Sequence, residues 1–310
     1  MTIPATSAGL RALSATAPIR RGFRTRPGPA FPDLCRPARL TAACNSGAMT
    51  MTTGTTPLSP EDIARFGADP LSAFRANLAS VEDRIARACA RAGRDRASVR
   101  LLPITKTVPA HVLHFAYAAG IACFGENKIQ EAMTKRDALS DLAIEWSIVG
   151  HLQTNKVKYL ARFAREFHAL DSLRLADLLN TRLEREDRFL DVYVQVNTSG
   201  EESKFGLNPD ALEPFVDALD QFPRLRARGL MTLALFSADM AKVRPCFSLL
   251  RHLRDEAAKR VPGLTGLSMG MTGDFEEAIE EGATVVRVGQ AIFGRRPTPD
   301  GHYWPGFAPG

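Results

Sequence analysis

Apolar residues form two kinds of pattern from about residue 60 onward, a helical period and short continuous runs. An amphipathic helix is predicted first, because apolar residues recur at intervals of three and four before Gly93. These residues are Leu71, Phe74, Leu78, Val81 and Ile85. Short apolar runs then predict eight strands, at residues 99–105, 122–124, 145–149, 166–170, 191–196, 227–233, 266–269 and 284–288. Helical patterns lie between them, including residues 112–119, 128–138, 173–185, 209–221 and 240–260.

Eight strands that alternate with helices are typical of a single (β/α)8 TIM-type barrel, here spanning residues 60–296. A doubly wound open sheet is the main alternative. Functional groups of such a barrel lie where its strands end, on the C-terminal face. The sequence therefore predicts that polar residues at these strand ends are brought together.

The polar residues at the strand ends are the first candidates for chemistry. They are Lys106, Glu126, Asn127, His151, Asp171, Ser172, Asn197, Thr198 and Thr232, with Met231 beside the last. Some of them have a purely local explanation. Asp171 and Ser172 are expected to cap the helix at 173–185, and Glu126 and Asn127 the helix at 128–138.

Two glycine-containing turns follow the last two strand candidates. Residues 270–273 (GMTG) open a helix headed by Asp274, and residues 287–290 (RVGQ) end the final strand. Exposed backbone N–H groups at such turns can hold a phosphate, and Arg287 adds a cation. The alternative is that these glycines only make turns in a βαβ connection.

Lys106 lies at the end of an apolar strand, between two threonines. Partial desolvation and neighbouring cations lower the pKa of a lysine and favour the neutral amine that attacks carbonyls. Together with phosphate turns, this indicates a Schiff base with a phosphorylated aldehyde, of which pyridoxal 5′-phosphate (PLP) is the common one. A solvated lysine at a strand end is the alternative.

The net positive charge of the chain is concentrated in the first 50 residues. Seven arginines and one acid, Asp33, give this segment a formal charge of +6, which equals that of the whole chain. A nucleic-acid-binding function would therefore rest on this segment alone, and we expect none. Its Ala, Pro, Arg, Ser and Thr content predicts a disordered or non-native extension.

Three explanations of this extension remain open. An Arg-rich, acid-poor start resembles a transit peptide, and Arg20-Arg21 resembles a twin-arginine signal without its apolar core. The third and favoured explanation is that translation starts at Met49 or Met51.

The five cysteines are scattered and predict neither a metal site nor disulfides. No apolar run reaches the roughly 18 residues of a membrane span.

Residues 71–296 resemble the pyridoxal phosphate homeostasis protein family, which is similar to the N-terminal barrel of alanine racemase. The resemblance rests on TKTVP (105–109), FGENKIQE (124–131), WSIVGHLQTNK (146–156), VQVNTSGEESKFGL (194–207), RGLMTL (228–233), SMGMTGDFEEAIEEG (268–282) and VRVGQAIFG (286–294). It implies a fold-type III PLP-binding barrel.

The resemblance also implies roles for particular residues. Lys106 matches the PLP-binding lysine, and Arg287 the residue that faces the pyridine nitrogen. Thr272, Gly289 and Gln290 match phosphate-contacting positions, and Ser268 and Met271 line the same pocket. The motifs at the mouth contain Asn127, His151, Asn197, Lys204 and Met231. Thr272 stands where serine is expected and Lys128 where an aromatic residue is common.

The resemblance implies a PLP carrier in vitamin B6 homeostasis, which holds PLP on Lys106 and passes it to apo-enzymes. An arginine beside the pyridine nitrogen disfavours ring protonation and makes the ring a poorer electron sink. A dedicated enzyme is therefore not expected, and a weakly active amino-acid racemase is the alternative. We expect a cytoplasmic monomer with no membrane partner. The tail at 297–310 lies beyond the resemblance, which assigns it no role.

Overall fold

The computed structural model describes residues 57–201 and 203–295. The predictions made for residues 1–50 and for the tail at 297–310 concern parts of the chain outside these ranges.

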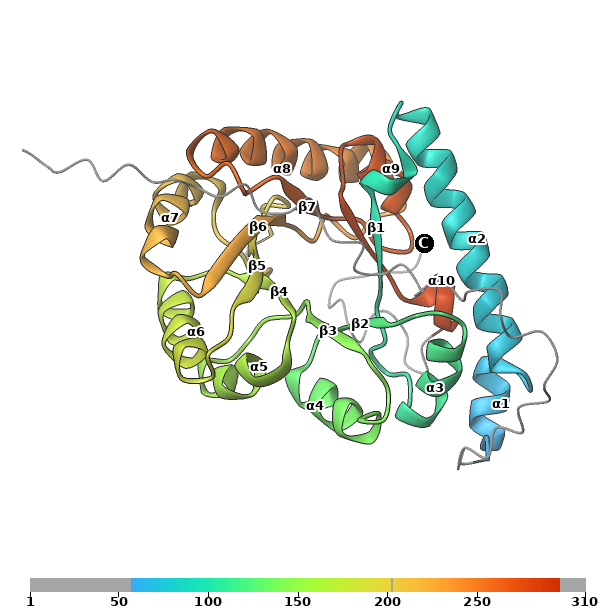
Figure 1. The fold of residues 1–310 in the computed structure, drawn as a ribbon. Helices are drawn as coiled ribbons and strands as arrows, with labels where there is room; N and C mark the ends of the chain where they lie inside the picture. The colour runs from blue at the N-terminus through green and yellow to red at the C-terminus, as the bar shows by residue number, and fades with distance from the viewer. Residues whose placement is uncertain (1–56, 202, 296–310) are drawn as a thin grey trace, which may run out of the picture. The chain divides into compact units, whose positions relative to one another are not determined.

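Eight parallel strands form one sheet, in the order β1-β8-β7-β6-β5-β4-β3-β2 (Figure 1). Their bounds are β1 Arg100–Pro103, β2 Cys123–Glu126, β3 Glu145–Ile148, β4 Glu166–Leu170, β5 Leu190–Gln195, β6 Leu225–Met231, β7 Gly266–Ser268 and β8 Val285–Val288. Just beyond β1, a parallel bridge joins Ile104 to Gly125 of β2, and the N–H of Thr105 donates to the carbonyl of Gly125 at 2.9 Å. The sheet is therefore a nearly closed α/β barrel. The predicted TIM-type barrel is confirmed, and the open-sheet alternative is wrong.

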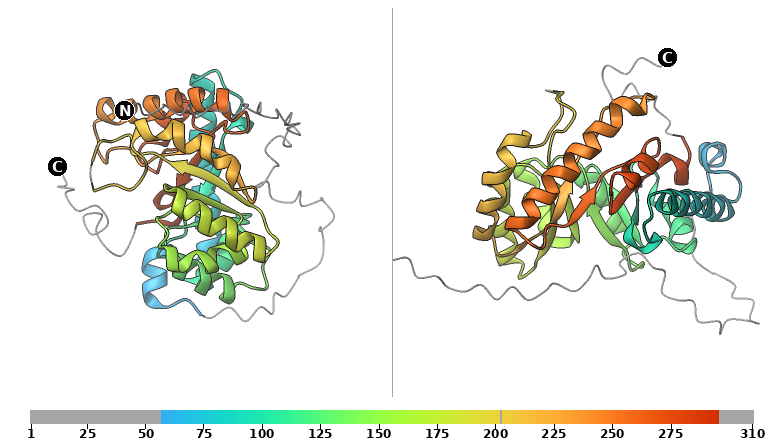
Figure 2. Two further views of the ribbon diagram at one scale, coloured as in Figure 1. Left: turned by 90° about the vertical axis from the view of Figure 1, so that its left-hand side faces the viewer. Right: turned by 90° about the horizontal axis from the view of Figure 1, so that it is seen from above.

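Helices surround the strands, as two further views show (Figure 2). They are α1 Pro60–Phe66, α2 Pro70–Arg91, α3 Ala110–Ala118, α4 Ile129–Ala138, α5 Val157–Phe163, α6 Leu173–Arg185, α7 Leu212–Ala218, α8 Met240–Arg260, α9 Phe275–Glu280 and α10 Gln290–Phe293. The helix predicted at 209–221 is instead α7 flanked by two short 3-10 turns. The sequence patterns of α1, α5 and α10 were too short to be recognised.

Helix α2 closes the ring of helices although it precedes the first strand. It packs between α3 and α9 and against α10, where its Phe74 ring meets the Phe293 ring edge-on at 5.3 Å. Ion pairs at 2.8 Å tie Arg84 to Glu276 and Arg91 to Glu280 of α9. The helix after β8, α10, has only four residues. Helix α2 therefore supplies the apolar cover that this short helix cannot provide.

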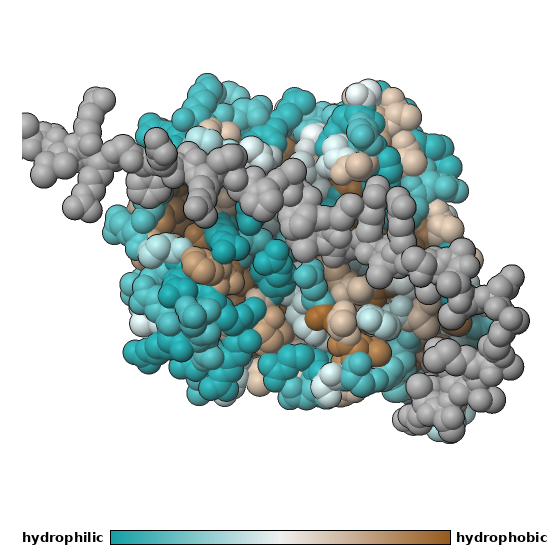
Figure 3. Space-filling model, in the orientation of Figure 1, coloured by the Kyte–Doolittle hydropathy of each residue, from teal (hydrophilic) through white to brown (hydrophobic). Residues whose placement is uncertain are grey.

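Apart from the first half of β6, the strands are buried along nearly their whole length, as expected of a parallel sheet covered by helices. In the view of Figure 3, hydrophilic residues dominate the surface around the ring. Cys89, Cys123 and Cys246 are buried free thiols. No helix within residues 57–201 and 203–295 has the length and apolar character needed to cross a membrane.

Candidate functional site

Three turns lie side by side at the C-terminal ends of neighbouring strands β1, β8 and β7. The N–H of Ile104, which leads into the Lys106 turn, donates to the carbonyl of Val288 at 2.9 Å. The N–H of Arg287 donates to the carbonyl of Gly270, also at 2.9 Å. The barrel therefore brings Lys106 together with the two glycine turns, at 287–290 and 270–273.

The nine predicted cofactor residues all lie at the same end of the barrel, where β1, β2, β6, β7 and β8 finish. Met231, Ser268 and Arg287 are buried. The other six are partly exposed: Lys106, Asn127, Met271, Thr272, Gly289 and Gln290. The predicted set therefore combines three buried and six partly exposed residues at one end of the barrel.

The turn after β7 depends on a glycine with left-handed backbone geometry. Gly270 has φ +91°, and the carboxylate of Asp274 accepts the N–H of Met271 at 2.5 Å. Burial raises the pKa of this carboxyl. Asp274 was expected to open the helix, and it does so by fixing the turn rather than by capping α9 through its side chain. Thr272 and Gly273 lie at the exposed tip.

Gly270→Ala is expected to lower the free energy of unfolding by about 3 kcal/mol. Left-handed backbone costs a residue with a Cβ about 1–2 kcal/mol, and overpacking costs about as much again. The added Cβ would lie 2.7 Å from the Cβ of Ala278. Urea unfolding measures the loss. Gly93→Ala is the matched control, because Gly93 has φ +64° and no atom within 4 Å of the added Cβ. Equal losses in both variants would contradict the packing argument.

Arg287 is fixed from two sides. Its Nη1 donates to Ser268 Oγ and its Nη2 to the carbonyl of Thr232, both at 2.8 Å. Burial lowers the pKa of Arg287 to about 10, against the opposing attraction of Asp274. A pKa of about 10 leaves the guanidinium charged at neutral pH.

A chain of hydrogen bonds continues from Arg287 into the barrel interior. Ser268 Oγ lies 2.9 Å from His168 Nδ1, and His168 Nε2 lies 3.2 Å from Glu166 Oε2. Burial lowers the pKa of His168 and thereby favours the neutral ring. A carboxylate can only accept, so we assign the ring proton to Nε2 and the Ser268 proton to the bond with Nδ1. Arg100 completes the chain by donating to both oxygens of Glu166, at 2.9 and 2.8 Å.

His168 and Glu166 were not predicted from the sequence to belong to this hydrogen-bond chain. Both lie in the strand at 166–170, which was predicted correctly. A polar residue in the middle of a strand that is buried on both faces was the available signal, because such a side chain must find partners inside the barrel.

The turn that carries Lys106 is bonded on both sides of that residue. The N–H of Val108 donates to the carbonyl of Thr105 at 3.0 Å, and Thr107 has φ +66°. Arg65 of α1 donates to the carbonyl of Thr107 at 2.6 Å and to its hydroxyl at 3.0 Å. Lys106 itself is half-buried. The turn is thus held from outside the barrel by α1.

Glu126 and Asn127 do not cap α4, contrary to the prediction. Glu126 Oε1 instead accepts from Lys135 Nζ and from Thr105 Oγ1, both at 2.6 Å. The α4 N-terminus has no side-chain cap. The buried Lys135, rather than the exposed helix end, is therefore the partner of this carboxylate.

Ser172, by contrast, accepts from the N–H of Leu175 at 3.3 Å and caps α6 as predicted.

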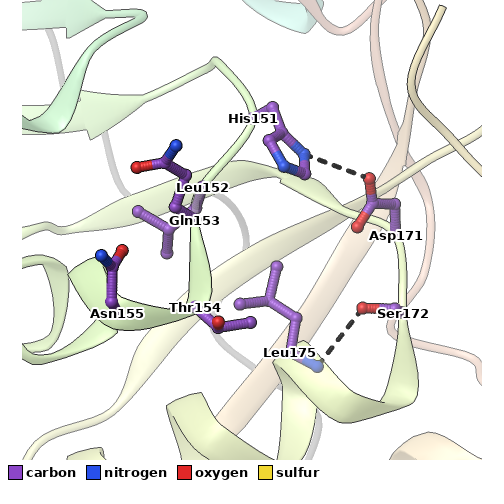
Figure 4. Close-up of a pocket in the computed structure, with 8 residues that line it drawn as sticks. All are labelled: His151, Leu152, Gln153, Thr154, Asn155, Asp171, Ser172 and Leu175. Carbon is purple, nitrogen blue, oxygen red and sulfur yellow. Dashed lines mark hydrogen bonds and ion pairs between the residues drawn. The ribbon is translucent and has the colours of Figure 1, made fainter.

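A hollow with a volume of about 530 Å³ lies at the ends of β3 and β4 (Figure 4). It is lined by His151, Leu152, Gln153, Thr154, Asn155, Asp171, Ser172 and Leu175. His151 points toward Asp171, at 3.6 Å, and stacks on the Phe205 ring with centroids 4.0 Å apart. None of the nine predicted cofactor residues lines this hollow. Its lining also contains neither lysine nor arginine, so the three turns are the stronger candidate site.

Asn197 and Lys204 organise the loop after β5. Asn197 Nδ2 donates to the carbonyl of Glu201 at 2.8 Å. Lys204 Nζ donates to the carbonyl of Ala234 at 2.9 Å and pairs with Glu201. These contacts lie within the loop or reach the segment after β6, so both residues shape the rim of the mouth.

A family model described as the N-terminal domain of alanine racemase matches residues 71–297. The pyridoxal phosphate homeostasis protein of Aquifex aeolicus is 44% identical over 220 residues, 71% of this chain and 96% of that protein. The human protein of the same name is 40% identical over 243 residues, 72% of this chain and 88% of that protein.

The chain is also similar to solved structures. PipY of Synechococcus elongatus, in a structure with PLP bound, is 32% identical and superposes with a TM-score of 0.63, covering 71% of this chain and 100% of PipY. Alanine racemase of Corynebacterium glutamicum is 17% identical with a TM-score of 0.56, covering 74% of this chain and 62% of the racemase. The second similarity shows a shared fold alone.

Proposed function

Because the chain belongs to the pyridoxal phosphate homeostasis protein family, we propose that it binds PLP and acts in intracellular vitamin B6 homeostasis. The observation that carries the proposal is the convergence of Lys106, Arg287 and two glycine turns on neighbouring strands. Relatives at 44% and 40% identity bear that family name, and the PLP-bound PipY structure shares the fold.

The residues present fit PLP chemically. Lys106 provides a primary amine and Arg287 a fixed cation, while the turn at 270–273 provides a hydroxyl and backbone N–H groups. Asn127 Oδ1 is buried and has no hydrogen-bond partner within the described residues. A buried oxygen without a partner is costly, and a hydroxyl on a ligand would satisfy it. In the proposed arrangement Thr272, Gly289 and Gln290 hold the phosphate, and Ser268, Met271 and Met231 line the pocket.

PLP would supply an aldehyde that condenses with a primary amine, with release of one water molecule. Lys106 is the amine that we assign to this condensation, as a Schiff base. Arg287 stays charged at neutral pH and is held by Ser268 and Thr232. A fixed positive charge disfavours protonation of a nearby pyridine nitrogen and weakens the ring as an electron sink. These properties favour holding PLP over carbanion chemistry.

The visible absorbance spectrum of the purified protein, before and after borohydride reduction, tests the proposal. A yellow protein whose reduced pyridoxyl group maps to Lys106 is the expected result. A colourless protein that cannot be charged with PLP would sink it. Robust racemisation of L-amino acids that is lost with Lys106→Ala would replace the carrier function by a catalytic one.

Thr272→Ala is expected to weaken PLP binding by about 1 kcal/mol, roughly fivefold in Kd, because one hydroxyl hydrogen bond is lost. Titration followed by absorbance measures the change. Thr134→Ala removes an exposed hydroxyl on α4, bonded only to the carbonyl of Gln130 in the described residues, and should bind PLP normally. Wild-type affinity in Thr272→Ala would refute the phosphate assignment.

The proposal extends to transfer of PLP to apo-enzymes by a monomeric protein in the cytoplasm. Incubation of the PLP-loaded protein with an apo-enzyme, with trapping of free PLP in parallel, tests direct transfer. Light scattering tests the monomer, and cell fractionation tests the location.

A further inference from the structure

A buried lysine lies beneath the turn that carries Lys106. Lys135 of α4 is buried, and its Nζ donates three hydrogen bonds. The acceptors are the carbonyl of Thr105 at 2.7 Å, Glu126 Oε1 at 2.6 Å and Glu131 Oε1 at 2.6 Å. An ammonium group has three N–H donors, so all of them are used. The Lys135 ammonium therefore has one defined position.

The same cluster contacts the backbone on both sides of Lys106. On the preceding side, the carbonyl of Thr105 accepts from Lys135, and Thr105 Oγ1 donates to Glu126 Oε1 at 2.6 Å. On the following side, the N–H of Thr107 donates to Glu131 Oε1 at 2.7 Å. One carboxylate oxygen of Glu131 thus joins the buried ammonium to the residue after Lys106.

Three ionisable side chains in this position are an expensive way to stabilise a barrel. Removing ions from water costs several kcal/mol each, and well-packed apolar residues of similar size are often as stabilising. Glu126 is completely buried, and burial raises its pKa to about 7 against the attraction of Lys135. We therefore attribute the cluster to the backbone geometry that it imposes. Thr107 is held at φ +66°, which residues with a Cβ rarely adopt.

We propose that Glu126, Glu131 and Lys135 are positioning residues that fix the Lys106 turn, so that the Lys106 amine is presented to the aldehyde of PLP. The inference rests on the proposed function. In the step that they assist, the amine nitrogen forms the C=N bond with the aldehyde carbon, and the carbonyl oxygen leaves as water together with the two amine hydrogens. The three residues act through the backbone of Thr105 and Thr107 and do not touch the reacting atoms.

Two measurements separate positioning from a merely structural role. The first is the rate at which PLP forms an adduct on Lys106, measured by reducing the adduct to a stable amine with borohydride. The second is the affinity for pyridoxine 5′-phosphate, which keeps the ring and the phosphate but has no aldehyde. A misplaced lysine slows the first and leaves the second unchanged, whereas a damaged pocket impairs both.

Glu131→Ala is the variant of choice, because Lys135→Met leaves Glu126 buried without its cation and could unfold the protein. Glu131 is half-buried on a helix, and alanine is the best helix former. Adduct formation is expected to slow about tenfold, since small misplacements of reacting groups are costly, with unchanged affinity for pyridoxine 5′-phosphate. Glu131→Gln, which keeps an acceptor oxygen for the Thr107 N–H, should restore most of the rate.

Asp137→Ala is the matched control. It also removes one carboxylate from α4, but its side chain is 65% exposed and pairs with Arg136. It should form the adduct at the wild-type rate. A wild-type rate in Glu131→Ala, or a parallel loss of adduct formation and pyridoxine 5′-phosphate affinity, would overturn the positioning role. Failure of the wild-type protein itself to form an adduct would instead overturn the proposed function.

Discussion

Lys106→Ala is expected to abolish covalent capture of PLP completely while leaving part of the non-covalent binding. No borohydride-stable pyridoxyl group should form, because the variant has no amine at the end of β1. The two glycine turns follow β7 and β8, and the hydrogen bonds that hold Met271 and Arg287 in place are made to Asp274, Ser268 and Thr232. We expect a loss of about 2 kcal/mol, roughly 30-fold in Kd, measured by equilibrium dialysis.

Lys259→Ala provides the control for this experiment. Lys259 lies in the last turn of α8, and its side chain is 67% exposed. It should retain both the adduct and the affinity. Adduct formation that persists in Lys106→Ala, on another lysine, would show that the reactive amine has been assigned to the wrong strand end.

Glu166→Gln is expected to destabilise the barrel by about 3 kcal/mol at pH 7, because removing one partner of a buried ion pair leaves the other charge uncompensated. Glu166 is almost completely buried, and its two oxygens accept from Arg100, Ser147 and His168. Burial alone would raise the pKa of Glu166, but Arg100 and the hydrogen bond from His168 outweigh burial and hold the pKa below its usual value. Urea unfolding measures the loss.

The loss should depend on pH in a defined direction. The pKa of Glu166 is lower in the folded than in the unfolded protein, so the folded state binds fewer protons there. The stabilisation is fully present above the unfolded pKa of about 4.3 and declines as the pH falls towards the lowered folded value. The difference between wild type and Glu166→Gln should therefore shrink below about pH 4.

Glu145→Gln is the matched control for Glu166→Gln. Glu145 begins β3, its side chain is 40% exposed, and its nearest ion-pair contact is Arg165 at 4.0 Å. A neutralised partner at such a site costs little, within about 0.5 kcal/mol. A difference for Glu166→Gln that stays constant down to pH 3, or equals that of Glu145→Gln, would contradict the assigned ion pair.

The sequence predicted the elements that have a strong local signal. Apolar runs bounded by turn residues identified all eight strands to within a few residues, and the helices at 173–185 and 240–260 match α6 and α8 at both ends. Shorter elements failed because one or two turns of helix do not establish a period. Helix α5 and the 3-10 turns around α7 are of this kind.

The candidate site could be predicted because the sequence shows locally where each strand ends. In a parallel barrel every strand ends at the same face, so Lys106, Thr272 and Arg287 had to lie at that face once the fold was known. Which turns are neighbours, however, follows from the pairing of β1 with β8 and of β8 with β7. These strands are far apart in the sequence or joined by a helix, so no local pattern reports the pairing.

The sequence by itself determined the alternation of strands and helices, the lysine at the end of the first strand and the two glycine turns at the end of the last two. The tertiary structure alone decided how the charged residues are used. Lys135 looks like an exposed helix residue beside Arg136, and Glu126 like a helix cap, but α4 folds back on β2 and buries both beneath Lys106. The hydrogen-bond chain from Arg287 through His168 to Glu166 likewise contains a bond between His168 and Ser268, which are 100 positions apart. Charge pairing of this kind depends on which side chains meet in a low-dielectric interior, and that is fixed only when the barrel closes.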